Sequence, residues 1–78
     1  MTAVRILVAE DNELVALTLE EQLKGLGYDV IGVARTGTEA IDLAMRLSPD
    51  IIIMDIRMPE MEGTEAAARI NNQRPVPI

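Results

Sequence analysis

Residues 51–63, IIIMDIRMPEMEG, decide how this chain of 78 residues is read. Four apolar residues, too few for a helix, lead directly into Asp55, and this predicts a buried strand that ends at a carboxylate. Pro59 and several polar residues follow, so the strand gives way to a loop. A carboxylate in this place indicates a chemical role that needs further acidic residues elsewhere in the sequence.

Short apolar stretches alternate with amphipathic ones along the whole chain. The predicted strands are Val4–Ala9, Tyr28–Ala34 and Ile51–Met54; the predicted helices run from Asn12 to Gly25, from Thr36 to Ser48 and from Gly63 to Asn72. The order β-α-β-α-β-α predicts right-handed crossovers and a parallel sheet with helices on both faces, an α/β fold. Val76-Pro77-Ile78 is expected to begin a fourth strand.

Helix starts and inward faces can also be read from the sequence. Asn12 is a predicted N-cap, and Thr36 with Glu39 has the spacing of a capping box. The residues that recur at helical spacing, and are therefore expected to face the sheet, are Ala16, Leu19, Leu23 and Leu26; Ala40, Ile41, Ala44 and Leu47; and Ala66, Ala67 and Ile70.

Composition excludes several kinds of function. With 13 acidic and 7 basic residues the net charge is −6, and only one residue is aromatic, so direct nucleic-acid binding is not expected. The sequence has no apolar run of membrane-spanning length and no signal pattern, which leads us to expect a cytoplasmic protein without membrane association. Cysteine and histidine are absent, so any metal would be a hard ion held by oxygen ligands.

Acidic residues follow two of the predicted strands. Glu10 and Asp11 come after the first strand, and Asp55 comes after the third. If these strands are neighbours, the three carboxylates converge at the carboxyl edge of the sheet, where ligands bind in such folds. Like charges at this distance repel, so at least one carboxyl group should have a raised pKa, and Mg²⁺ would suit the cluster best. Asp55 is then a metal ligand or a nucleophile that forms an aspartyl-phosphate.

Each acidic group alone has a simpler interpretation. Glu10 and Asp11 are ordinary residues for a turn that leads into a helix, and Asp55 is an ordinary turn residue before Pro59. The joint pattern favours a site, because both groups fall at strand ends on the same edge of the sheet.

Three stretches of the sequence are similar to a known family: VRILVAEDN at residues 4–12, IIIMDIRMPEMEG at 51–63, and YDVIGVARTGTEAIDLAMRLSPD between them. Together they resemble the receiver domain of two-component response regulators. The resemblance covers the whole chain. It implies a flavodoxin-like fold in which the three strands present have the order 2-1-3, with the first and third side by side.

The resemblance also implies roles. Asp55 looks like the residue that accepts a phosphoryl group from a partner histidine kinase or phosphotransfer protein. The groups implied to hold Mg²⁺ are Glu10, Asp11, Asp55 and the backbone carbonyl of Arg57. Pro59 and Gly63 are expected to shape the loop and carry no chemistry.

The family pattern continues beyond residue 78. A receiver has a Ser or Thr after its fourth strand and a Lys after its fifth, and the only lysine here is Lys24, within the first helix. Residues 1–78 are therefore expected to be a receiver domain that is incomplete at its C-terminus and possesses no complete switch. We also expect the third strand, which has no charge or proline at residues 51–54, to self-associate through its exposed edge.

Two other functions are compatible with the same residues. One is a Mg²⁺-dependent phosphatase with an aspartate nucleophile, although such enzymes carry a second aspartate where this chain has Arg57. The other is an oligomerising fragment whose acidic site is vestigial.

Overall fold

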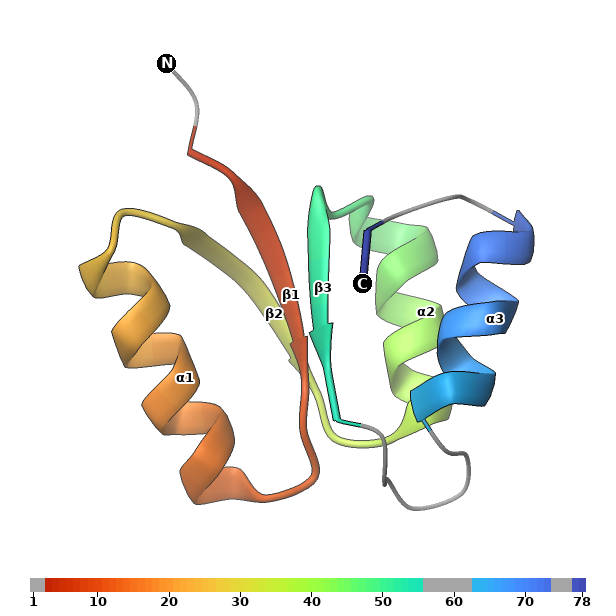
Figure 1. The fold of residues 1–78 in the computed structure, drawn as a ribbon, viewed down its shortest axis with the longest axis horizontal. Coiled ribbons are helices and arrows are strands. Elements are labelled where there is room, and N and C mark those ends of the chain that lie inside the picture. Colours follow the sequence, from red (N-terminus) through yellow and green to blue (C-terminus); the bar gives the residue numbers. More distant parts are fainter. Residues whose placement is uncertain (1–2, 56–62, 74–76) are drawn as a thin grey trace.

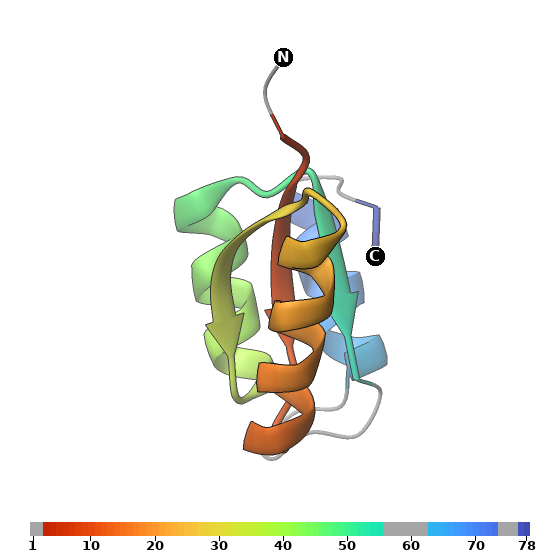
Figure 2. The same ribbon diagram turned by 90° about the vertical axis from the view of Figure 1, so that its left-hand side faces the viewer.

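The computed structural model describes residues 3–55, 63–73 and 77–78, which form a parallel sheet with helices on both faces (Figure 1). The elements are β1 (Arg5–Ala9), α1 (Glu13–Gly25), β2 (Asp29–Ala34), α2 (Gly37–Leu47), β3 (Ile51–Met54) and α3 (Gly63–Gln73). The three strands have the order β2-β1-β3, and both pairings are parallel. Figure 2 shows α1 on one side of the sheet and α2 with α3 on the other. The predicted flavodoxin-like order is confirmed.

The helices begin where the sequence predicts. The Asn12 side chain accepts a hydrogen bond from the Val15 N–H at 3.1 Å, which caps α1. The Thr36 hydroxyl accepts from the Glu39 N–H at 3.1 Å, and the Glu39 carboxylate accepts from the Arg35 N–H at 3.3 Å, one residue before the cap. No helix in the described ranges has both the length and the apolar character needed to cross a bilayer.

The core lies mainly between the sheet and the α2–α3 layer. Its two buried clusters are Leu7, Ala44, Ile52 and Ile70, and Ala9, Ala34 and Ala40. All seven side chains are at most 1% exposed, and the alanines allow α2 to lie close to the sheet. The inward faces predicted for α2 and α3 are confirmed at Ala40, Ala44, Ala66 and Ile70.

The inward face predicted for α1 is wrong at one residue. Ala16 is buried and Leu19 and Leu23 are half-buried, but Leu26 is 75% exposed. The helix ends at Gly25, and Gly27 then turns the chain with a φ of 94°, so Leu26 no longer follows the helical period.

Gly32 of β2 lies close to side chains of α2 and β1. A Cβ atom at this position would be 3.1 Å from a Leu47 methyl carbon and 3.4 Å from one of Leu7. The pairing of β1 with β2 also shifts here, because Ile6 pairs with Val30 and Leu7 with Gly32. The irregularity makes room for the two leucine side chains between strand and helix.

The predicted fourth strand is only partly testable, because residues 74–76 lie outside the described residues. The carbonyl oxygen of Pro77 accepts a hydrogen bond from the Ile52 N–H at 2.9 Å. Pro77 therefore lies against the outer edge of β3, in the place where a neighbouring strand would pair, although no strand is formed at residues 77–78.

Arg5 connects the start of β1 to the end of α2. Its guanidinium group donates hydrogen bonds to the carbonyl oxygens of Leu47 at 2.7 Å and Ser48 at 2.9 Å. Its backbone N–H donates to the Asp50 carboxylate at 2.8 Å, and the Asp50 N–H donates to the Arg5 carbonyl at 2.8 Å. Carbonyl groups in the last turn of a helix lack intrahelical donors, so Arg5 caps α2 from another part of the chain.

We predict that Arg5→Met lowers the free energy of unfolding by about 1–3 kcal/mol, because two helix-terminal carbonyl groups lose a charged donor. Urea denaturation followed by circular dichroism measures the change. Arg46→Met is the matched control, since Arg46 makes only an exposed pair with Asp42 at 3.4 Å, which is worth less than about 1 kcal/mol. Equal effects of the two substitutions would contradict the capping role of Arg5.

Candidate metal centre at the carboxyl edge of the sheet

The three strands end at the same level, and this positions the acidic residues. Ala9 of β1 pairs with Ala34 of β2 on one side and with Met54 of β3 on the other. The Glu10 N–H donates to the Ala34 carbonyl and the Asp55 N–H donates to the Ala9 carbonyl, both at 2.9 Å. Each hydrogen bond extends the sheet by one residue, so the two acidic residues lie side by side.

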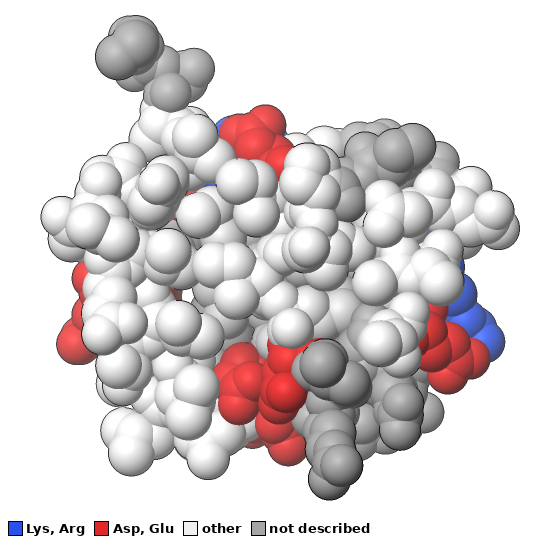
Figure 3. Space-filling model, viewed as in Figure 1, with Lys and Arg blue, Asp and Glu red and all other residues white. Residues whose placement is uncertain are grey.

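The predicted convergence of three carboxylates is confirmed. One carboxylate oxygen from each of Glu10, Asp11 and Asp55 lies within 4.8 Å of the others. Glu10 and Asp55 are half-buried, while Asp11 is exposed. Acidic atoms gather at the lower edge of the molecule in the view of Figure 3. Within the described ranges this is the one group of three or more such side chains close enough to share an ion.

The proximity of these groups changes the protonation of Glu10. Partial burial raises the pKa of Glu10 above its ordinary value of 4.5, and the negative charge of Asp55 raises it further. A hydrogen bond from protonated Glu10 to the Asp55 carboxylate and the charge of Asp11 act in the same direction. The Asn12 N–H, 3.4 Å from a Glu10 oxygen, opposes them. The raised pKa predicted for one member of the cluster is therefore found at Glu10.

The donor atoms fit a hard divalent cation. All three side chains offer oxygen, and an ion between them would remove the repulsion that raises the pKa of Glu10. Mg²⁺ commonly binds through one or two carboxylates and keeps water molecules, which suits a partly exposed cluster. The carbonyl of Arg57 and the ring of Pro59, both named from the sequence, lie outside the described residues. Gly63 is the first residue of α3.

Comparison with known proteins identifies the family. Residues 6–78 match the model of the response regulator receiver domain. The chain belongs to this family. The receiver is 43% identical to the transcriptional regulatory protein PdtaR of Mycobacterium tuberculosis over 74 residues. The matched region is 95% of this chain and 36% of that protein. It is 46% identical over 79 residues to protein-glutamate methylesterase/protein-glutamine glutaminase 2 of Carboxydothermus hydrogenoformans. That match covers 100% of this chain and 22% of the relative.

Solved structures agree with this assignment. The response regulator domain of Thermotoga maritima CheB has a TM-score of 0.93 and is 34% identical, covering 96% of this chain and 57% of that one. The signal receiver domain of the putative response regulator NarL from Mycobacterium tuberculosis has a TM-score of 0.93 at 31% identity. The match covers 97% of this chain and 63% of that one. The chain thus spans little more than a third, or less, of the curated relatives described above.

One charged pair beside the carboxylates of this receiver was missed by sequence reasoning. Arg35 follows β2, and its guanidinium group lies 3.8 Å from the carboxylate of Glu13 in the first turn of α1. The signal was present in the sequence, because Arg35 directly follows the predicted strand Tyr28–Ala34 and therefore had to fall at the same edge as Glu10.

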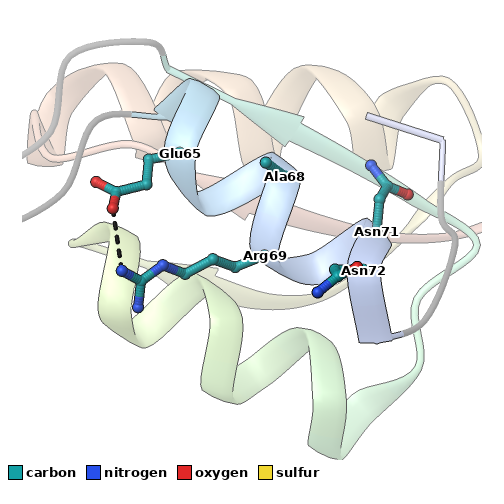
Figure 4. Close-up of a pocket in the computed structure, with 5 residues that line it drawn as sticks. All are labelled: Glu65, Ala68, Arg69, Asn71 and Asn72. Carbon is teal, nitrogen blue, oxygen red and sulfur yellow. Dashed lines mark hydrogen bonds and ion pairs between the residues drawn. The ribbon is translucent and has the colours of Figure 1, made fainter.

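One hollow of the receiver lies on the surface of α3. Figure 4 shows its lining, which consists of Glu65, Ala68, Arg69, Asn71 and Asn72. Its charged members form an ion pair one helical turn apart, with 3.0 Å between Arg69 and Glu65. This surface has the character of an exposed helix face and shows no grouping of metal-binding side chains.

We predict that Glu10→Gln flattens the pH dependence of stability in metal-free buffer. The raised pKa means that the folded state binds the proton of Glu10 more tightly than the unfolded state does. This contribution to stability is complete below the unfolded pKa, near 4.5, and is lost as the pH rises through the folded value. Urea denaturation in EDTA from pH 4 to pH 7 should therefore show a larger fall for the native sequence than for Glu10→Gln.

Glu21→Gln is the control for this measurement, since Glu21 is an exposed carboxyl group on α1. It should leave the pH profile of the native sequence unchanged. If Glu10→Gln gives that same profile, the carboxyl groups do not interact strongly enough to favour a bound cation.

Proposed function

We propose that this receiver accepts a phosphoryl group on Asp55 from a phosphohistidine of a kinase or phosphotransfer protein and passes the signal on as a change in its contacts. The observation that carries this proposal is the position of the Asp55 carboxylate, within 4.8 Å of Glu10 and Asp11 at the carboxyl edge of the sheet. Ligands bind at this edge in folds of this kind, and grouped carboxylates can hold the divalent cation that phosphoryl transfer uses.

The phosphoryl transfer breaks one bond to phosphorus for each bond that it forms. A carboxylate oxygen of Asp55 forms a bond to phosphorus, while the bond from phosphorus to the donor's histidine nitrogen breaks. The electron pair of the broken bond stays on the imidazole, which takes up a proton. Asp55 needs no base, because it reacts as a carboxylate.

The groups proposed to hold Mg²⁺ are Glu10, Asp11, Asp55 and the backbone carbonyl of Arg57. A bound Mg²⁺ supplies positive charge to the transferring phosphoryl oxygens. Glu10 and Asp11 would hold the cation beside Asp55, and its positive charge would oppose the upward shift in the pKa of Glu10.

Partner and location are proposed from the family. The donor is a histidine kinase or a phosphotransfer protein, and such donors act in the cytoplasm, where we place this receiver. The relatives include a transcriptional regulatory protein and a protein-glutamate methylesterase/protein-glutamine glutaminase, and the matched regions are 36% and 22% of those proteins. We further propose that residues 1–78 are a receiver domain incomplete at its C-terminus, without the Ser or Thr and the Lys of the family pattern.

We predict that acetyl phosphate with Mg²⁺ adds one phosphoryl group to the chain, and that Asp55→Asn abolishes the addition. Intact-mass spectrometry measures the adduct. EDTA should also abolish it, because the carboxylate repulsion is then not offset. Asp42→Asn, an exposed position on α2, is the matched control and should react like the native sequence.

The same experiment separates the alternatives. Release of phosphate over many turnovers without an adduct would support the Mg²⁺-dependent phosphatase, which the arginine at position 57 disfavours. An adduct that persists in Asp55→Asn would refute Asp55 as the acceptor. No reaction at all would favour a vestigial site.

We also propose that the outer edge of β3 pairs with a second copy of the chain. Ile51 and Ile53 are half-buried, and the strand carries no charge. The Ile52 N–H at this edge donates a hydrogen bond to the Pro77 carbonyl, so the edge can pair with extended backbone. Pairing with a second copy would use the remaining backbone groups of the edge or replace this bond.

Light scattering over a dilution series tests this pairing. The native sequence should have a molar mass above that of a monomer at the highest concentration, and Ile51→Lys should lower it, because a charge at an edge opposes pairing. Circular dichroism confirms that the variant is folded. A monomer at all concentrations would contradict the proposal.

A further inference from the structure

Arg35 lies in one row with the acidic residues. Ala34, Ala9 and Met54 are level in neighbouring strands, so the residues that follow them, Arg35, Glu10 and Asp55, occupy equivalent places at the carboxyl edge. Neighbouring strands are about 4.8 Å apart, which puts the backbone of Arg35 one strand from Glu10 and two strands from Asp55. An extended arginine side chain can cross one strand spacing, toward the position of Glu10.

The backbone of Arg35 is fixed, but its side chain is held weakly. The N–H of Arg35 donates to the Glu39 carboxylate at 3.3 Å, which anchors the residue to the start of α2. The guanidinium group has the Glu13 carboxylate as its ion-pair partner at 3.8 Å, and the two side chains are 48% and 82% exposed. Exposed ion pairs of this kind are weak and are screened by salt, so the guanidinium group can exchange Glu13 for another anion.

The other cations in the described part of the chain lie elsewhere. Arg5 is at the start of β1, and Lys24 and Arg46 are in the last turns of their helices, at the opposite edge of the sheet. Arg69 is within α3 and pairs with Glu65. Of these cations, Arg35 is the one that directly follows a strand at the carboxyl edge of the sheet, as Glu10 and Asp55 do.

We propose that Arg35 is a positioning residue for the phosphoryl donor: its guanidinium group leaves Glu13 and contacts the phosphoryl oxygens as the donor approaches Asp55. This inference rests on the proposed function. A dianionic phosphoryl group is repelled by the three clustered carboxylates, and a guanidinium group offsets this repulsion and can bind two phosphoryl oxygens at once. Glu13 competes with the phosphoryl group for the same cation.

Four substitutions test the proposal through the initial rate of Asp55 phosphorylation by acetyl phosphate with Mg²⁺. Arg35→Gln should lower the rate by roughly threefold to tenfold, and Glu13→Gln should raise it by about twofold, because the cation is then released. Arg46→Gln and Asp42→Asn change the net charge by the same amounts in an ion pair on α2, and each should leave the native rate unchanged. The effects at residues 35 and 13 should shrink at high salt, which a purely structural role would not cause.

A binding measurement keeps this inference separate from the proposed function. Inorganic phosphate is titrated into the native chain with Mg²⁺ while NMR follows the Nε–H signals of the arginine side chains. The Arg35 signal should shift and saturate, and the Arg46 signal should stay in place. If acetyl phosphate adds no phosphoryl group to the native chain, the proposed function fails, yet the titration still decides the role of Arg35.

The inference is overturned by either of two results. One is an Arg35→Gln rate equal to that of Arg46→Gln in protein that is phosphorylated. The other is an Arg35 Nε–H signal that does not move with phosphate.

Discussion

The level ending of three parallel strands around β1 is the constraint on which the site depends. Ala9 has Ala34 on one side and Met54 on the other, and β1 is the central strand. Because side chains alternate between the faces of a sheet, a slip of β3 by one residue would turn Asp55 to the other face. Register therefore brings Asp55 to Glu10, and the hydrogen bonds of the Glu10 and Asp55 N–H groups secure that register at the edge itself.

The α2 layer supports this register from one face. Ala40 and Ala44 are fully buried, so the helix rests on the strands with short side chains between them. Met54 packs against both buried clusters of that face, and it is the residue directly before Asp55. The position of the Asp55 carboxylate thus depends on how the helices pack, and a shift of either one requires an adjustment of the other.

Much of the fold could be predicted because it depends on local patterns. The strand at residues 51–54 and the N-caps at Asn12 and Thr36 follow from short stretches of sequence. The meeting of Glu10 with Asp55 also followed, because a parallel sheet places all strand ends at one edge.

Features that depend on tertiary geometry could not be predicted in the same way. The cap that Arg5 places on α2 joins residues more than 40 positions apart. The shifted register near Gly32 reflects the shape of two leucine side chains, one of them on α2. Leu26 was misassigned because the helical period does not reveal the residue at which a helix stops. The pairing of Arg35 with Glu13 depends on how α1 sits over β2.

The contacts of Arg5 also bear on the order in which the chain can assemble. They join residues 42 to 45 positions apart, and they close only when the segment leading into β3 is in place. During synthesis, the first strand can meet the second once residue 34 has emerged, but its other neighbour arrives some twenty residues later. Closing that long loop lowers the conformational entropy of the chain, and this free-energy cost arises before the new contacts stabilise the sheet. Completion of the sheet is therefore a late and non-local step. Until then, the strand at the centre of the finished sheet is one of its edges.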